Sequence, residues 1–275
     1  MYPFSYIRPS SVQEAVDYLS RFSEARALSG GMTLIPTLKQ RLGAPTHLVD
    51  LSRLPELQGI AHQKGILRIG AATRHADVAQ SDIVQHFLPA LSDLAGLIGD
   101  QQVRNRGTIG GSIANSDPAA DYPSAIMALK ATVVTNRRRI SGDAFFLGMF
   151  ETALEPAEII VALEFSVPAR AAYMKHRHAA SGYAVVGVFI ADFGDDVRVA
   201  VTGAGPFAFR WTEAEQKLAT SQLGAHSNNL LADTMLDPDK LNEDLTATGA
   251  YRAHLTSVLA QRALSAMFAL KPQAD

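Results

Sequence analysis

The residues best suited to chemistry in this chain lie in the stretch Arg104–Asp121, which is rich in small and polar side chains. Within it, Gly110 and Gly111 stand between Thr108 and Ser112. A glycine pair lets the backbone approach a ligand closely, because no Cβ atom intervenes. Backbone N–H groups in such a turn favour an anion, and hydroxyl donors suit phosphate oxygens. The stretch therefore predicts a phosphate-binding loop.

Possible acceptors follow the glycines, and a second glycine pair lies upstream. Asp117 and Asp121 can accept hydrogen bonds from sugar hydroxyls or a ring N–H, although Asp117 is equally suited to cap the turn at Pro118. The segment Ser29–Pro36 repeats the pattern of a glycine pair flanked by hydroxyls. An isolated pair is usually only a turn. Two such loops, however, can grip a diphosphate from two sides, although neither fits the Walker or the spaced-glycine dinucleotide pattern.

Regular elements are expected on either side of these loops. Residues 25–28 predict a strand that leads into the first glycine loop, and residues 33–41 predict a helix after it. A strand, a glycine loop and a helix N-terminus in that order form an anion site. Further along, residues 183–193 and 197–202 predict a β-hairpin, and residues 251–270 predict a helix with one apolar face.

Composition excludes several classes of protein. The formal net charge of −2 gives no electrostatic basis for nucleic-acid binding. No apolar run approaches the ~18 residues of a membrane span, and the first residues lack a signal-peptide pattern, so we expect a cytoplasmic protein. The chain has no cysteine, so any iron–sulfur cluster it works with must lie on another chain.

The two glycine loops resemble a known pair of cofactor signatures. Ser29-Gly30-Gly31-Met32-Thr33-Leu34-Ile35-Pro36 and Thr108-Ile109-Gly110-Gly111-Ser112-Ile113-Ala114-Asn115 are similar to the FAD motifs of the flavin-binding medium subunits of molybdenum hydroxylases, the family of xanthine dehydrogenase and carbon monoxide dehydrogenase. The resemblance covers nearly the whole chain. It differs at Ser112, where many members have Asn.

The resemblance implies an α+β architecture. Residues 1–170 would form an FAD-binding domain of the vanillyl-alcohol-oxidase (PCMH) type, with subdomains at about 1–56 and 57–170. Residues 171–275 would form a C-terminal domain in which a three-stranded antiparallel sheet packs against helices.

The resemblance also implies which residues contact the cofactor. Lys175 would stabilise negative charge on reduced flavin and Tyr183 would cover the ring, although an exposed strand lysine and a packed strand tyrosine are comparable alternatives. Gly110→Val is expected to abolish FAD binding in a folded protein. The cofactor-binding residues expected are Ser29, Gly30, Gly31, Met32, Thr33, Leu34, Thr108, Ile109, Gly110, Gly111, Ser112, Asn115, Asp121, Ile160, Lys175 and Tyr183.

No catalytic or metal site is expected on this chain. His75 is expected to be structural, and a metal site at His176 and His178 lacks a third ligand. No Ser/His/Asp or paired-carboxylate arrangement is recognisable. The redox chemistry would belong to the flavin alone.

The resemblance implies an electron-transfer subunit of an oxidoreductase. It would take electrons from the 2Fe–2S clusters of a small partner subunit and pass them to an external acceptor. A large partner subunit would carry the molybdenum cofactor and the substrate, in a heterotrimer. The alternatives are a free-standing FAD-dependent oxidoreductase of the same fold and a non-catalytic nucleotide-binding scaffold subunit.

Overall fold

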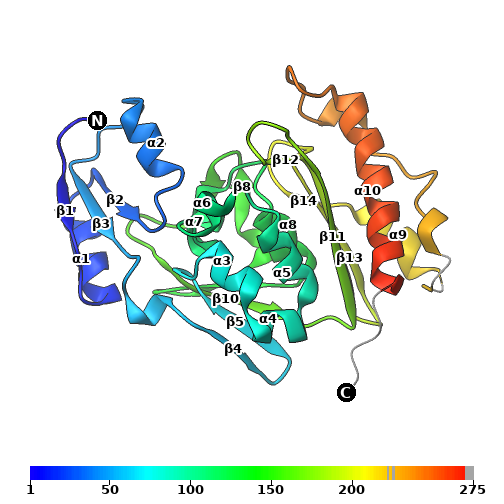
Figure 1. Cartoon of the computed structure of the whole chain (residues 1–275), viewed down its shortest axis with the longest axis horizontal. Coiled ribbons are helices and arrows are strands. Elements are labelled where there is room, and N and C mark those ends of the chain that lie inside the picture. Colours follow the sequence, from blue (N-terminus) through cyan, green and yellow to red (C-terminus); the bar gives the residue numbers. More distant parts are fainter. Residues whose placement is uncertain (222, 225–226, 270–275) are drawn as a thin grey trace.

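The computed structural model describes residues 1–221, 223–224 and 227–269, and confirms the predicted α+β class. Helices and strands gather around three larger sheets, which lie side by side from the N-terminal to the C-terminal part of the chain (Figure 1), and the described residues also form a small two-stranded sheet in the middle part. The glycine loops lie where the first two parts meet, and a loop of the third reaches the same region.

The N-terminal part is a small parallel sheet in the order β1-β3-β2. Its first helix begins at Ser11, whose side-chain oxygen accepts the N–H of Glu14 at 3.2 Å, a common helix cap. Ala15 on that helix and Val49 on the central strand are fully buried and build the core of this part. Its elements are β1 (Ser5–Ile7), α1 (Val12–Arg21), β2 (Ala25–Leu28), α2 (Leu34–Lys39), β3 (His47–Asp50) and the 3-10 helix η1 (Pro55–Leu57).

The middle part is an antiparallel sheet in the order β4-β5-β10-β6-β7, with short helices packed against it. Strands β4 and β5 form a hairpin, with Lys64 and Gly65 at its turn. The strands of this part are β4 (Ile60–Gln63), β5 (Ile66–Gly70), β6 (Thr132–Thr135), β7 (Arg139–Ser141), β8 (Phe146–Gly148), β9 (Glu151–Thr152) and β10 (Ile160–Ser166). The helices are α3 (His75–Gln80), α4 (Asp82–Phe87), α5 (Pro89–Gly96), α6 (Gln101–Arg104), α7 (Ile109–Asn115), α8 (Tyr122–Ala128) and the 3-10 helix η2 (Gly142–Ala144).

The C-terminal part is an antiparallel sheet in the order β11-β12-β13-β14, so the expected three strands gain a fourth. The added strand has only two residues, too few to produce an alternating pattern in the sequence. The elements are β11 (Arg170–Arg177), β12 (Ala184–Asp192), β13 (Val197–Thr202), β14 (Phe209–Arg210), α9 (Thr212–Ala219), η3 (Ser227–Asn229), η4 (Pro238–Lys240) and α10 (Gly249–Ala269). The predicted last helix is therefore present, although Leu270 lies outside the described residues.

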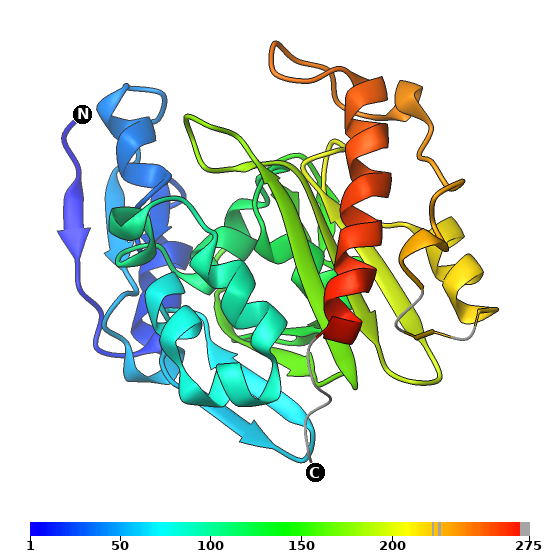
Figure 2. The same ribbon diagram turned by 45° about the vertical axis from the view of Figure 1, so that its right-hand side comes forward.

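Strand β12 joins the C-terminal part to the middle part, because it is buried along its whole length. Phe189 and Ala191 pack into the core of the middle part, whereas Val188 and Ile190 pack against α10. Alternating side chains of a strand point to opposite faces, so one strand contributes to both cores. Figure 2 shows α10 lying across β11 and β12. No helix in the described part of the chain is long and apolar enough to cross a membrane.

The second glycine pair lies inside α7, so the open loop expected at Gly110 and Gly111 is a helix. Thr108 caps this helix, and its Oγ1 accepts the Gly111 N–H at 3.2 Å. The Gly110 N–H donates to the Ala71 carbonyl at 2.8 Å, and a Cβ at Gly110 would lie 2.5 Å from the Ala71 Cβ. Gly110 is therefore needed for packing, and Gly110→Val is expected to disturb the fold itself, contrary to the sequence-based expectation.

Candidate functional site

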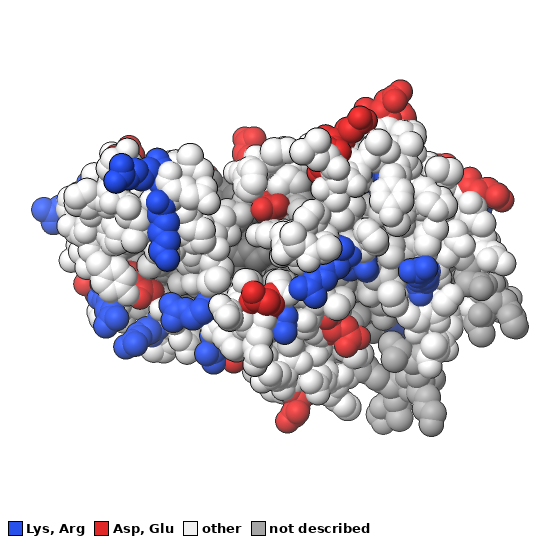
Figure 3. All heavy atoms as spheres, turned by 45° about the horizontal axis from the view of Figure 1, so that its top comes forward, with Lys and Arg blue, Asp and Glu red and all other residues white. Residues whose placement is uncertain are grey.

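A cavity of about 520 Å³ lies where the three parts of the chain meet. Figure 3 shows its opening as a hollow between the N-terminal part and the rest of the molecule. Its volume is within the range of small-molecule and cofactor sites, roughly 300–1,000 Å³. Besides the two glycine loops, its walls include Leu51, Leu57, Ile98, Gly99, Val103, Leu154, Glu158, Ile159, Ser181 and Gly182.

The structure brings nearly all the predicted cofactor-binding residues together in this cavity. The exceptions are Ile109 and Lys175. Ile109, the first residue of α7, is fully buried in the core, and the Lys175 side chain forms an ion pair with Asp121 outside the cavity lining. The predicted residues that line the cavity are Ser29, Gly30, Gly31, Met32, Thr33, Leu34, Thr108, Gly110, Gly111, Ser112, Asn115, Asp121, Ile160 and Tyr183.

The first glycine loop offers free backbone donors to the cavity. Among the described residues, no acceptor is found for the N–H groups of Gly30, Gly31, Met32 and Thr33. Gly31 has a φ of +72°, a left-handed conformation that glycine adopts without strain. Unpaired N–H groups that follow such a turn form an anion-binding nest. The amides of the first loop thus remain available to an anion, whereas the glycine amides of the second donate within the protein.

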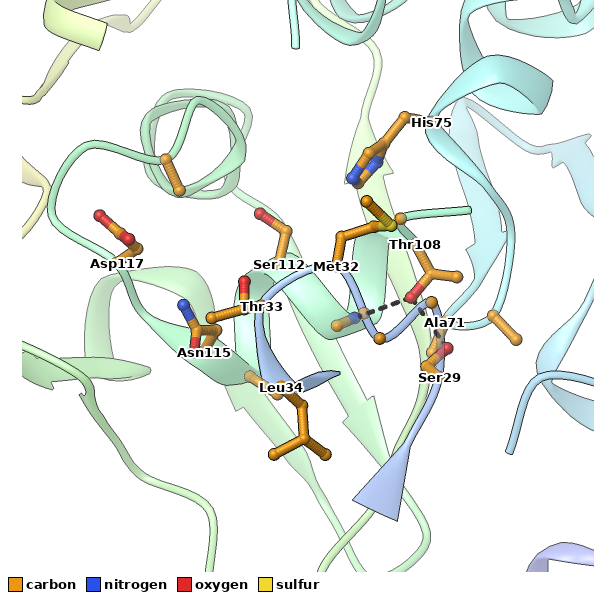
Figure 4. Close-up of a pocket in the computed structure, with 18 of the residues that line it drawn as sticks. Ser29, Met32, Thr33, Leu34, Ala71, His75, Thr108, Ser112, Asn115 and Asp117 are labelled. Carbon is orange, nitrogen blue, oxygen red and sulfur yellow. Dashed lines mark hydrogen bonds between the residues drawn. The ribbon is translucent and has the colours of Figure 1, made fainter. Parts of the chain in front are cut away.

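Direct contacts hold the two loops against each other. The Ser29 Oγ and Thr108 Oγ1 lie 2.9 Å apart, as Figure 4 shows. A Cβ on Gly30 would lie 2.2 Å from the carbonyl oxygen of Arg106 and 2.6 Å from the Cα of Gly107. Gly30 therefore permits a backbone-to-backbone contact that no other residue allows without rearrangement. Ser112, on α7, projects a hydroxyl into the space beside this junction.

A buried ion pair supports the far wall of the cavity. The Lys175 Nζ lies 2.8 Å from the Asp121 Oδ1 and also donates to the Leu97 carbonyl at 3.1 Å. The Tyr173 hydroxyl donates to the same carboxylate at 2.6 Å. Burial raises the pKa of the Asp121 carboxyl, and the Lys175 ammonium opposes that rise. Lys175 is therefore neither the exposed strand lysine considered above nor an unpaired cation.

Asp117 and Tyr183 lie at the rim of the cavity. The Asp117 Oδ1 accepts the Ala119 N–H at 2.9 Å, so the alternative of a turn cap is confirmed, and the residue also lines the cavity. Tyr183 is 39% exposed and is the last residue of the loop that joins β11 to β12. Burial and the nearby Asp117 raise the pKa of its phenol. Its hydroxyl is therefore neutral and polar at the mouth of the cavity.

Glu158 contributes a charged carboxylate to the cavity wall. Arg138 donates to it from Nε and Nη2, each at 3.0 Å, and Thr135 donates at 2.7 Å. These contacts, above all the hydrogen bonds from Arg138, lower the pKa of Glu158 to about 2 although burial opposes the shift. The sequence carried no local signal for this pair, because its partners lie 20 residues apart and meet only through the sheet.

His75 was expected to be structural, yet it lines the cavity while only 4% exposed. Its backbone N–H donates to the Gly107 carbonyl at 3.0 Å, and its ring packs beside Tyr122. Burial and the nearby Arg104 lower its pKa to about 4, so the imidazole is neutral at neutral pH. Only the tertiary fold reveals this position, since nothing around His75 in the sequence resembles a binding motif.

Two family models together cover almost the entire chain. The FAD binding domain in molybdopterin dehydrogenase matches residues 2–169, and the CO dehydrogenase flavoprotein C-terminal domain matches residues 169–267. The chain is 37% identical to the carbon monoxide dehydrogenase medium chain of Hydrogenophaga pseudoflava, covering 97% of each chain. It is 28% identical to the xanthine dehydrogenase FAD-binding subunit of Escherichia coli O157:H7, covering 95% of this chain and 94% of that protein. A solved structure of carbon monoxide dehydrogenase from H. pseudoflava superposes with a TM-score of 0.87 at 35% identity, covering 98% of this chain and 99% of that one.

Removing the ammonium of the buried ion pair is expected to destabilise the protein. Lys175→Met leaves the buried Asp121 carboxylate without its cation, and should lower the free energy of unfolding by about 3 kcal/mol, measured by urea denaturation. Adding Asp121→Asn should recover most of this loss, because no buried charge then remains. Lys130→Met is the control: its partly exposed pair with Asp196 should cost less than about 1 kcal/mol. Equal losses for both lysine variants would contradict the buried-pair interpretation.

The stability of the protein should fall in acid. The folded-state pKa of His75, about 4, lies below its ordinary value of 6.5, so the unfolded chain binds the proton more readily between these values. The unfolding free energy should therefore decrease by about 2 kcal/mol from about pH 7.5 to about pH 5 through this group. His75→Gln should remove that part of the pH dependence. Below this range Glu158 continues the loss, from its ordinary pKa of 4.5 down to about 2. An unchanged pH slope in His75→Gln would refute the assignment to His75.

Proposed function

This chain belongs to the family of FAD-binding medium subunits of molybdenum hydroxylases, and from that premise we propose that it binds FAD non-covalently in the cavity and transfers electrons. In this proposal it accepts electrons from 2Fe–2S clusters on a small partner subunit and delivers them to an external acceptor. The substrate is oxidised on a large partner subunit that carries the molybdenum cofactor. The three subunits would assemble as a heterotrimer.

The unpaired N–H groups of the first glycine loop carry this proposal. A diphosphate is an anion with many acceptor oxygens, and the nest from Gly30 to Thr33 presents donors that have no partner in the described part of the chain. The hydroxyl of Ser112 adds a donor on the facing wall. Glu158 and Asp121, the buried carboxylates of the cavity, each form an ion pair with a cationic side chain. This pairing reduces their repulsion of an anionic ligand.

Other side chains suit the rest of an extended dinucleotide. Leu57, Ile159 and Ile160 form an apolar wall where an aromatic ring can pack. We place sugar and ribityl hydroxyls near Asn115 and Asp121, whose oxygens can accept from them. Tyr183, at the opening, is positioned to cover a ring face. The subdomains at 1–56 and 57–170 would hold the cofactor between them, and residues 171–275 would supply the loop that carries Tyr183.

The role of this chain's residues is to bind and position, because FAD supplies the redox chemistry when bound. The buried pair of Asp121 and Lys175 adds no net charge beside the cofactor, and it fixes the segment that leads into α8. Relatives of this chain belong to enzymes named for carbon monoxide, glyceraldehyde and xanthine. This variety supports placing substrate recognition on another subunit.

The test of FAD binding uses a pair of near-isosteric variants at Thr33, the exposed residue that precedes α2 and makes no side-chain cap bond. Purified wild-type chain, stripped of cofactor, should bind FAD in a fluorescence titration. Thr33→Asp should weaken binding about 100-fold, because its carboxylate repels the diphosphate and competes for the free N–H groups. Thr33→Asn should stay within a few-fold of wild type.

Neither variant removes a helix cap, because the Thr33 side chain makes no cap bond, and both alter its contact with Tyr183 in the same way. Equal affinities for the two variants would refute the diphosphate nest. Failure of the wild-type chain to bind FAD at all would refute the proposed function.

A further inference from the structure

We propose that His75 contacts the flavin ring system directly, donating a hydrogen bond from its Nε2–H to an acceptor on the ring. This inference rests on the proposed function. It assigns a role to a buried cavity residue that lies in neither glycine loop, and it makes His75 a determinant of how strongly the chain holds reduced relative to oxidised FAD.

A continuous wall runs from His75 to the loop that carries Tyr183. A Cβ on Gly107 would lie 2.6 Å from the His75 Nε2 and 3.1 Å from the Val103 carbonyl. One on Gly99 would lie 2.9 Å from the Val103 Cβ, and one on Gly182 would lie 3.2 Å from the Gly99 Cα. At each of these glycines the space that a Cβ would fill is occupied by a neighbouring protein atom, so glycine lets the segments of this wall pack closely against one another. His75 lies at one end of that surface and Gly182, next to Tyr183, at the other.

The surroundings of the two ring nitrogens of His75 indicate which of them carries the hydrogen. The Nδ1 atom is fully buried and has no partner among the described residues. The Nε2 atom is not one of these buried, unpartnered atoms. A neutral imidazole carries one N–H, and a buried N–H without an acceptor costs more than a buried lone pair without a donor. The hydrogen therefore belongs on Nε2. Burial and Arg104 hold the pKa of the ring at about 4, which keeps this donor neutral at neutral pH.

The position of His75 favours the ring over the diphosphate. The free N–H groups of residues 30–33 already provide an anion site on the first loop, while the wall of Gly107, Val103 and Gly99 offers little polar side-chain surface. Figure 4 shows the imidazole at the edge of the cavity, beyond the Met32 side chain. A flavin ring carries carbonyl and nitrogen acceptors along one edge. Two-electron reduction adds electron density there, so a fixed donor binds the reduced ring more tightly.

The test compares the affinities of the full-length chain for oxidised and dithionite-reduced FAD, titrated anaerobically. His75→Phe keeps a flat ring and removes the donor. It should weaken binding of reduced FAD about tenfold more than binding of oxidised FAD, the ratio expected for one hydrogen bond to a developing charge. The midpoint potential should fall correspondingly. His75→Gln, which restores an N–H donor, should recover at least part of the ratio.

A histidine outside the cavity provides the control. His62→Phe alters a histidine stacked on Phe87 outside the cavity, and should change neither affinity. If His75→Phe does not fold, His75→Leu provides the same comparison. An unchanged ratio of the two affinities in the donor-free variant would overturn the role of His75 while leaving the proposed function intact. Absence of FAD binding by the wild-type chain would instead refute the proposed function.

Discussion

The cavity depends on a close contact between two loops that are far apart in the sequence. Gly30 lies against the backbone of Arg106 and Gly107 at a distance that no Cβ permits, and the Ser29 and Thr108 hydroxyls meet beside it. The residues of the first loop line the cavity beside this junction, and among the described residues their N–H groups from Gly30 to Thr33 have no acceptor. Gly30 thus serves here to let two backbones meet, and the anion site that we propose lies beside that contact.

The C-terminal part stabilises the opposite wall. The Thr202 Oγ1 donates to the Ala120 carbonyl at 2.6 Å, and Gly203 donates its N–H to the Pro118 carbonyl at 2.8 Å. Lys175, on β11 of the same sheet, forms the ion pair with the Asp121 side chain. The segment 117–121 is therefore fixed by both its own turn and the sheet of another part. Lys175 supports this wall by neutralising the buried carboxylate of Asp121, although its own side chain does not line the cavity.

Much of this arrangement could be predicted from the sequence, and the remainder has identifiable physical reasons. The strand before Ser29, the hairpin of β12 and β13 and the last helix follow from local patterns, and the paired glycine motifs identified the family. The sequence did not show that Gly110 and Gly111 lie within a helix, because Thr108 caps it and the Ala71 carbonyl takes the Gly110 N–H across the fold. His75 and Glu158 were missed for a related reason. Their surroundings are built by distant strands and loops, and only burial and long-range partners give them a place in the cavity.

The central claim, that the N–H groups of the first loop hold the diphosphate of FAD, can be tested residue by residue. Amide chemical shifts of the isotope-labelled chain would be followed by TROSY NMR as FAD is added to the cofactor-free protein. The amides of Gly30, Gly31, Met32 and Thr33 should move strongly downfield, since they change from unpaired donors to donors toward charged oxygens. The amide of Gly110, which already donates to Ala71, should move much less. Saturable FAD binding that left the amides of residues 30–33 unshifted would contradict this account.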